Sequence, residues 1–165
     1  MPIVRHALPA AFRLPAAAAA DGGIDITSAD PSGDADRIRS LVEQALTDVF
    51  PDGPRLSVAG LLGELRSRPG RLVSTWLARR SGDVADGGGR LGLIALVATT
   101  SVTGPRCSIS WLLVGPHARR LGIGTALVDH ALEAAAKLGA KRVFVETRAD
   151  WPAARAFWDA IASRS

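Results

Sequence analysis

The stretch of sequence that decides the fold reads as a strand, a tight turn and the start of a helix: Trp111-Leu-Leu-Val-Gly-Pro-His-Ala-Arg-Arg-Leu-Gly-Ile-Gly-Thr125. Its apolar beginning predicts a buried strand, which ends at Gly115 and Pro116. Gly122 and Gly124 allow backbone N–H groups to approach a ligand closely, and the N-terminus of a helix carries about half a positive charge. Because two arginines also stand in the turn, the stretch predicts a site for an anion, and a pyrophosphate fits it.

Two known phosphate-binding patterns do not match this loop. A dinucleotide fingerprint needs a third glycine where Leu127 stands, and a nucleotide P-loop needs Gly-Lys-Ser or Gly-Lys-Thr, which the sequence lacks. A glycine-rich helix entry that binds nothing is the remaining alternative. This alternative must also explain Arg119, Arg120, the proline turn that precedes them and the strand that follows.

The whole chain has 165 residues and a mass of 17.2 kDa, which predicts one domain with a sizeable core. Its single cysteine, Cys107, excludes an internal disulfide framework and a cysteine-based zinc site, so no metal is expected, and the absence of tyrosine excludes phenol chemistry. The net charge of +4 comes from scattered basic residues, which favour a solvated surface over nucleic-acid binding.

The sequence predicts neither a membrane span nor a signal for secretion. No apolar run reaches the roughly 18 residues of a membrane span. In the N-terminal segment, an arginine and several prolines interrupt the continuous apolar stretch that a signal sequence needs. A cytoplasmic location is therefore expected.

Outward from the quoted stretch, the hydrophobic pattern predicts an α+β domain of three layers, with a mixed, mostly antiparallel sheet and helices on both faces. Residues 21–165 are expected to form this single domain, and residues 1–20, rich in alanine and proline, a disordered arm. Strands are expected at 24–27, 71–80, 91–102, 107–114 and 142–147. Helices are expected before each of two stops, near residue 50 and at Gly139, and over the ranges 57–68 and 152–161.

Two parts of the chain together resemble the GNAT superfamily of acetyl-CoA-dependent N-acetyltransferases. The family pattern Arg/Gln-x-x-Gly-x-Gly/Ala follows a strand of the type Leu-x-Val-x-Pro, and it matches Leu112 to Pro116 and then Arg119, Gly122 and Gly124. The segment 143–158 is similar to the last conserved block of the family, written around Asn-x-x-Ala-x-x-Phe-Tyr. Two separate patterns in the right order make the resemblance specific over about residues 108–161.

The resemblance implies acetyl-CoA as co-substrate and an amine as acceptor. The CoA pyrophosphate would be held by the backbone amides of Arg119, Arg120, Leu121, Gly122, Ile123, Gly124 and Thr125. The edge of the strand at Leu113 and Val114 would pair with the pantetheine arm, in a gap between this strand and the one at 143–147. The amine would attack the thioester directly in a ternary complex, with the N–H of Val114 at the developing oxyanion.

The sequence departs from the family at the position of its usual acid. Trp158 stands where the family has the tyrosine that protonates the departing thiolate, and Trp151 stands where it has asparagine. Indole is no acid at neutral pH, but a thiol of pKa about 8.5 can leave as thiolate, so the departure weakens catalysis without forbidding it. Trp158 either packs at the thioester or belongs to the core beside Phe157.

No general base can be identified from the sequence. Ser108 stands where some relatives carry a catalytic glutamate, and Glu146 is the nearest carboxylate in sequence. His117 and His130 are expected to be solvated. The catalytic residues therefore stay open, and the alternative function is a non-catalytic acyl-CoA-binding or regulatory domain of the same fold.

The sequence also lacks the last two strands of the family pattern. Relatives continue beyond the Phe-Tyr position with strands that cover the outer edge of the strand at 143–147. An uncovered strand edge pairs readily with another chain. The sequence therefore predicts either a homodimer through this edge or a marginally stable domain.

Overall fold

The computed structural model describes residues 3–10, 23–47, 58–80, 90–148 and 151–164 of the chain. Its elements follow the order β1 (Ile3–Pro9), β2 (Ile24–Ala29), α1 (Ala35–Thr47), α2 (Val58–Glu64), β3 (Arg71–Arg80), β4 (Arg90–Ser101), β5 (Gly104–Val114), the 3₁₀ turn η2 (Pro116–Ala118), α3 (Ile123–Lys137), β6 (Arg142–Arg148) and α4 (Pro152–Ala162). Apart from β1 and η2, this is the order that the hydrophobic pattern predicts.

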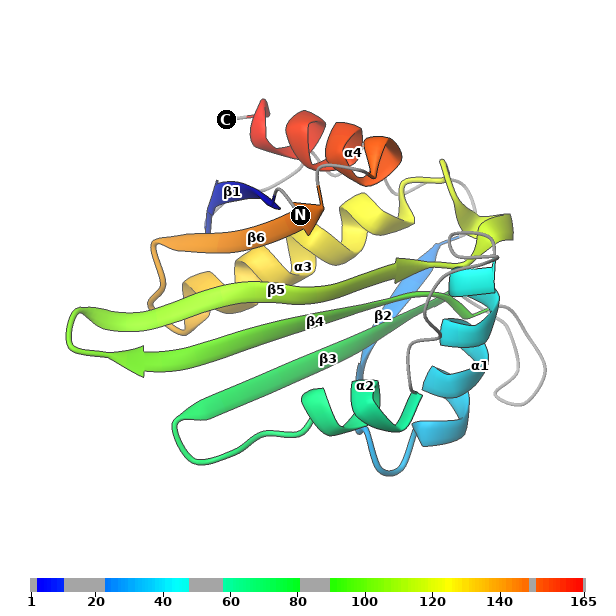
Figure 1. Ribbon diagram of the computed structural model, residues 1–165, viewed down its shortest axis with the longest axis horizontal. Helices are drawn as coiled ribbons and strands as arrows, with labels where there is room; N and C mark the ends of the chain where they lie inside the picture. The colour runs from blue at the N-terminus through cyan, green and yellow to red at the C-terminus, as the bar shows by residue number, and fades with distance from the viewer. Residues whose placement is uncertain (1–2, 11–22, 48–57, 81–89, 149–150, 165) are drawn as a thin grey trace.

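One six-stranded sheet, in the order β1-β6-β5-β4-β3-β2, forms the middle layer of the molecule (Figure 1). Neighbouring strands are antiparallel except for β5 and β6, which are parallel because α3 connects them. The prediction of a mixed, mostly antiparallel sheet is confirmed.

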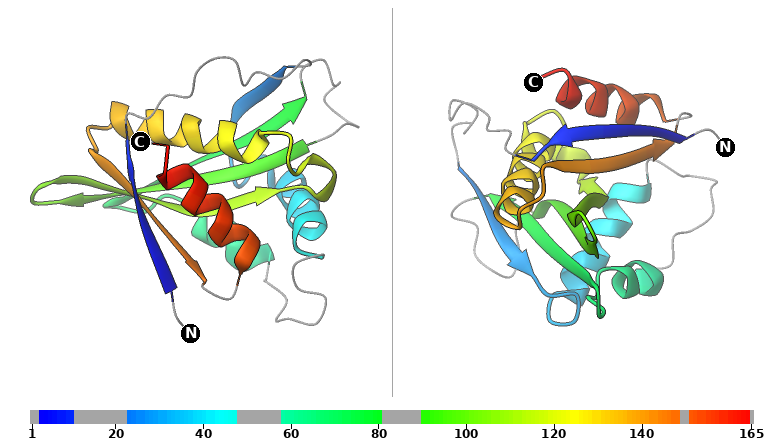
Figure 2. Two further views of the ribbon diagram at one scale, coloured as in Figure 1. Left: turned by 90° about the horizontal axis from the view of Figure 1, so that it is seen from above. Right: turned by 90° about the vertical axis from the view of Figure 1, so that its left-hand side faces the viewer.

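The helices divide between the two faces of the sheet (Figure 2), and each face has its own apolar core. Residues of α1 and α2 pack on one face, and residues of α3 and α4 on the other. The alternation in β4 explains this arrangement, because Leu93 and Ala95 belong to the first core whereas Ile94 and Leu96 belong to the second. The predicted three-layer α+β class is therefore confirmed.

The prediction of a disordered arm over residues 1–20 is wrong for Ile3–Pro9, which form β1, while residues 11–20 lie outside the described part of the chain. β1 runs antiparallel to β6 along that whole strand, from Ile3 opposite Arg148 to Pro9 opposite Arg142. The outer edge of β6 is therefore covered by the N-terminal segment of the same chain. The expectation of an uncovered edge there, and of a homodimer through it, is wrong for this reason.

β1 forms because its residues alternate between a buried and an exposed side. His6 and Leu8 are buried, whereas Ile3, Arg5 and Ala7 are exposed. Leu8 belongs to the core that α3 and α4 cover, and Arg5 forms an ion pair with Glu146 across the two strands. The alternation covers few residues and stops at a proline beside an alanine-rich segment, which explains why the sequence pattern alone did not reveal the strand.

The remaining differences from the predicted elements are small shifts of their ends. α2 ends at Glu64 rather than at 68, and the turn between β4 and β5 lies at 102–103, so that Gly104 and Pro105 already belong to β5. The predicted end of the first helix near 50 and the predicted connection at 81–89 lie outside the described residues. None of the described helices is long and apolar enough to cross a membrane.

The docking of β1 can be tested by truncating a buried side chain on it. We expect Leu8→Ala to lower the free energy of unfolding by about 2–5 kcal/mol, because Leu8 is 1% exposed and its loss leaves a cavity in the core. Ile3→Ala on the same strand is the matched control; Ile3 is 62% exposed, so its loss should cost no more than about 0.5 kcal/mol. Urea unfolding measures both variants, and equally small losses would contradict the docked strand.

Candidate functional site

β5 and β6 pair over only three residue pairs and then part. Their parallel ladder begins with Cys107 opposite Val143 and ends with Ile109 opposite Val145, although β5 continues to Val114 and β6 to Arg148. Figure 1 shows the two strands diverging towards their arrowheads. Within the described residues, the β6-facing edge of β5 therefore has no strand partner from Ser110 onward.

A β-bulge in β5 lies where the strands part. β4 pairs Ala95 with Trp111 and Leu96 with Ile109, which leaves Ser110 as an extra residue in β5. A bulge bends its strand and increases the local twist. β5 can therefore turn away from β6 while it stays paired with β4 as far as Val114. The gap that the family resemblance implies between these two strands is present in the structure.

Two residues in the left-handed region turn the chain from the end of β5 into α3. Arg119 is extended, Arg120 has a φ of 64°, and Gly122 has a φ of 79°. In the described part of the chain, Arg120 is the one non-glycine residue with a positive φ, a conformation that costs an L-residue about 1–2 kcal/mol. Nothing lies within 4 Å of a Cβ placed on Gly122, so this position requires glycine for its backbone conformation and not for space.

The first turn of α3 presents its amides without a side-chain cap. Gly122 is the N-cap residue, and its carbonyl accepts a hydrogen bond from the N–H of Ala126. The N–H groups of Ile123, Gly124 and Thr125 lie in the turn before Ala126. Such groups at a helix N-terminus have no acceptor within the helix. They suit an anionic ligand, because the helix dipole adds positive potential at the same place.

The nine residues predicted to bind the co-substrate lie in two adjoining pieces of chain. Leu113 and Val114 end β5, and the loop and first turn of α3 contain Arg119, Arg120, Leu121, Gly122, Ile123, Gly124 and Thr125. The side chains of Leu113 and Ile123 are buried in the two cores. At these positions only the backbone is available to a ligand.

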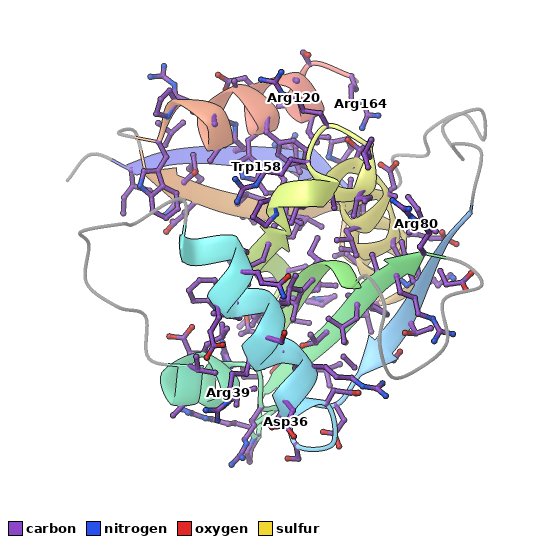
Figure 3. All side chains as sticks on the ribbon, turned by 90° about the vertical axis from the view of Figure 1, so that its right-hand side faces the viewer. Asp36, Arg39, Arg80, Arg120, Trp158 and Arg164 are labelled. Atoms are coloured by element: carbon purple, nitrogen blue, oxygen red, sulfur yellow. The ribbon has the colours of Figure 1, made fainter. Side chains whose placement is uncertain are left out.

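Arg119 differs from a typical anion-binding arginine, because its guanidinium bonds to two backbone carbonyls. Its Nε donates to the carbonyl oxygen of Val114 at 3.3 Å, and its Nη2 donates to that of Ala45 at 3.1 Å. Ala45 lies in the last turn of α1, where carbonyls lack intrahelical partners. Arg119 thus joins the end of α1 to the end of β5. The neighbouring Arg120 is exposed, on the loop that leads into α3 (Figure 3).

Gly124 lies at the contact between α3 and α4. A Cβ placed on Gly124 would lie 3.4 Å from the ring of Phe157 and 3.5 Å from Cγ2 of Val114. Trp158 is only 5% exposed, belongs to the core and packs edge-to-face on Phe157 with ring centroids 5.0 Å apart (Figure 3). Of the two possibilities for Trp158, the structure therefore shows the core position.

Of the residues considered as a general base, Glu146 and His130 are engaged in other contacts. Glu146 pairs with Arg5, and Ser108 is half-buried in the sheet between Val97 and Phe144. His130 is half-buried and not solvated as expected, because it packs against the ring of Trp76 on β3 at 5.1 Å; burial lowers its pKa. The side chain of His117 lies outside what the structure describes.

The described residues also contain no cluster of histidine, cysteine or carboxylate side chains that could hold a metal ion. Burial raises the pKa of the Cys107 thiol, which disfavours its reactive thiolate form.

The sequence model of the acetyltransferase (GNAT) family matches residues 36–161, a range that includes the loop, the two parting strands and most of α4. The chain belongs to this family. No curated protein matches the chain.

Solved structures of GNAT proteins share the fold. The glucosamine N-acetyltransferase region of a fungal multi-domain β-N-acetylglucosaminidase has a TM-score of 0.67 at 20% identity. The match covers 86% of this chain but only 17% of the fungal chain. An aminoglycoside acetyltransferase from an uncultured soil metagenomic sample has a TM-score of 0.62 at 17% identity, over 84% of this chain and 86% of that one. A ribosomal-protein-alanine N-acetyltransferase from Brucella melitensis has a TM-score of 0.63 at 14% identity, over 87% and 93%. At these identities the likeness shows the fold alone.

Sequence reasoning missed three features of the site. These are the extra residue at Ser110, the carbonyl contacts of Arg119, and a hydrogen bond from the indole of Trp111 to Glu64. The run from Trp111 to Val114 is apolar throughout. Because apolar and polar residues do not alternate in it, the sequence does not show where an extra residue shifts the pairing of the strand. The other two features join residues far apart in the sequence.

The requirement for glycine at position 122 gives a stability prediction. Gly122→Ala should lower the free energy of unfolding by about 1–2 kcal/mol, because an L-residue is strained at this φ even with open space around it. Gly63→Ala is the matched control; Gly63 lies inside α2 with nothing within 4 Å of its Cβ position, so alanine should stabilise the protein by up to about 1 kcal/mol. Thermal unfolding compares the two, and shifts of the same sign would contradict the left-handed loop.

Asp129 on α3 gives a pH prediction. Burial raises the pKa of its carboxyl from 3.8 to about 6, an effect that Arg164, at 3.9 Å, partly offsets. The folded protein thus keeps a proton that the unfolded chain has already released, so stability should fall as pH rises from about 4 to 6. Asp129→Asn should remove this fall, and Asp36→Asn, at an exposed position, should keep it. Thermal unfolding between pH 4 and 7 tests this, and an unchanged slope in Asp129→Asn would refute it.

Proposed function

We propose that the chain transfers the acetyl group of acetyl-CoA to an amine by direct attack in a ternary complex. The GNAT fold serves acyl transfer from acetyl-CoA in general. One observation carries the proposal for this chain: the edge of β5 that is open beyond Ile109 leads directly to the uncapped first turn of α3. A free strand edge followed by a row of amides suits an extended ligand with an amide-bearing arm and a pyrophosphate.

The backbone of the site suits acetyl-CoA, which supplies the activated acyl group. The open edge at Leu113 and Val114 would bind the pantetheine amides as an added strand would. The amides from Arg119 to Thr125 would hold the pyrophosphate, and the exposed Arg120 would add a cation beside it. Arg119 would keep β5 and the loop in position through its two carbonyl contacts.

The transfer needs few side chains. The neutral amine forms its bond to the acyl carbon as the bond from that carbon to sulfur breaks, and we assign the N–H of Val114 to the developing oxyanion. Trp158 lies in the core and indole gives up no proton at neutral pH, so the CoA thiol leaves as thiolate. The acceptor ammonium loses one proton to water before attack, and the nitrogen loses a second proton to water as the amide forms.

The acceptor class rests on the same proposal. The similar structures are named for glucosamine, for aminoglycosides and for a ribosomal-protein alanine, all of which carry primary amines. A cytoplasmic location agrees with the free thiol of Cys107 and stays a prediction.

The activity can be measured as CoA release from acetyl-CoA with a panel of primary amines. We expect transfer by the wild type and by Gly124→Ala, because a methyl group at this position meets Phe157 and Val114 at 3.4–3.5 Å, close to ordinary contact. Gly124→Trp should lose binding and transfer while it keeps a folded far-UV CD spectrum. Tight binding without transfer to any amine would contradict the proposal and support the non-catalytic alternative.

The pH dependence tests the absence of a side-chain base. If water removes the ammonium proton, log kcat/KM should rise with pH at unit slope and level off at the pKa of the acceptor amine. Acceptors of different amine pKa should shift this plateau accordingly. If log kcat/KM instead levels off at the same pH for every acceptor, a base on the protein removes the proton and the proposal of water as the base is wrong.

A further inference from the structure

A carboxylate lies on the α1/α2 face of the sheet, beside the point where β5 and β6 part. Trp111 directly follows the bulge residue Ser110, and its side chain packs against the core that α1 and α2 cover. The indole Nε1 of Trp111 donates to Oε2 of Glu64 at 2.9 Å. The last residue of α2 is thereby fixed above the beginning of the open edge of β5.

Within the described part of the chain, the carboxylate of Glu64 forms no ion pair, whereas the carboxylates of two other glutamates do. Glu146 pairs with Arg5 and Glu133 pairs with Lys137. Arg71 does approach Glu64, but its Nη1 donates to the backbone carbonyl at 3.0 Å and so fixes the end of α2. Glu64 is exposed, and its negative charge is open to a cation from solution.

The two faces of the sheet differ in how they are packed beside the open edge of β5. On the α3/α4 face, Phe157 lies against Gly124 and Val114, and Trp158 fills the core beneath α4. On the α1/α2 face, Phe144 and Glu146 of β6 belong to neither of the two cores. Trp111, at the start of the open edge of β5, faces this same side and is bonded to Glu64.

We propose that Glu64 binds a second positive charge on the acceptor, so that the preferred acceptor is a molecule with at least two amino groups. This inference rests on the proposed acetyl transfer. Glu64 accepts from Nε1 in the five-membered ring of the Trp111 indole, so its carboxylate is held beyond this side chain and away from the backbone of β5. In the proposed geometry the reacting nitrogen lies at the open edge of β5, and a second ammonium group on the same molecule reaches Glu64.

Trp111 acts as a positioning residue for this contact. Its indole N–H occupies one carboxylate oxygen and fixes the direction in which the other faces. A charged hydrogen bond held in this way loses little side-chain freedom when a ligand binds. Trp111→Phe keeps an aromatic ring against the core and removes the hydrogen-bond donor.

The test compares two acceptors that differ by one charge, 1,4-diaminobutane and 1-butylamine. We expect the wild type to prefer the diamine in kcat/KM by roughly 10- to 100-fold, mainly through KM, because a charged hydrogen bond contributes this range. Glu64→Gln should remove the preference by lowering kcat/KM with the diamine towards the value with 1-butylamine. Trp111→Phe should weaken the preference to an intermediate value.

Glu133→Gln is the matched control, since it removes the same charge from an exposed position on α3. It should keep the full preference for the diamine. A direct measurement of binding complements the kinetics: 1,4-diaminobutane added to the CoA-bound wild type should shift the NMR resonance of the Trp111 indole N–H, and it should not do so in Glu64→Gln.

The outcomes separate the two proposals. If the wild type transfers acetyl groups but uses both amines equally, or if Glu64→Gln keeps the preference, the role of Glu64 is refuted and the acetyl transfer stands. If the wild type transfers to no amine, the proposed function fails and this inference fails with it. Loss of the preference in Glu133→Gln as well would mean that overall charge, and not Glu64, attracts the diamine.

Discussion

A strand that contains one residue more than its neighbour has to bend, and in this protein the extra residue stands where the sheet must open. Ser110 separates the part of β5 that pairs with both β4 and β6 from the part that pairs with β4 alone. The second part keeps its conformation because β4 holds it on one side and its side chains alternate between the two cores. Its free backbone groups need hydrogen-bond partners, which water or a ligand can supply.

The opening of the sheet also depends on β1. Beyond Val145, β6 no longer pairs with β5, so its ladder continues only through Glu146, Thr147 and Arg148 to Arg5, Val4 and Ile3. Without β1, the end of β6 would have no strand partner in the described structure. The N-terminal strand thus lets β6 leave β5 and still remain part of a sheet, while Arg119 fixes the other wall of the opening to α1.

The sequence was informative where local chemistry decides the structure. The strand before Gly115, the glycine-rich start of α3 and the order of the later elements all follow from residue types and short spacings. The strand β1 was missed because His6 and Leu8 are its only fully buried members, too few for a clear alternation. Trp158 could be placed in the core only by the structure, since its position in the family pattern is compatible with either role.

The account depends most on the claim that acetyl-CoA occupies the open edge of β5 and the first turn of α3. Amide hydrogen exchange followed by NMR, with and without acetyl-CoA, tests this most directly. We expect new protection at Ile123, Gly124 and Thr125 and at the amides of β5 beyond Ile109 that face β6. Protection confined to other parts of the chain, or none at saturating acetyl-CoA, would contradict the assigned site.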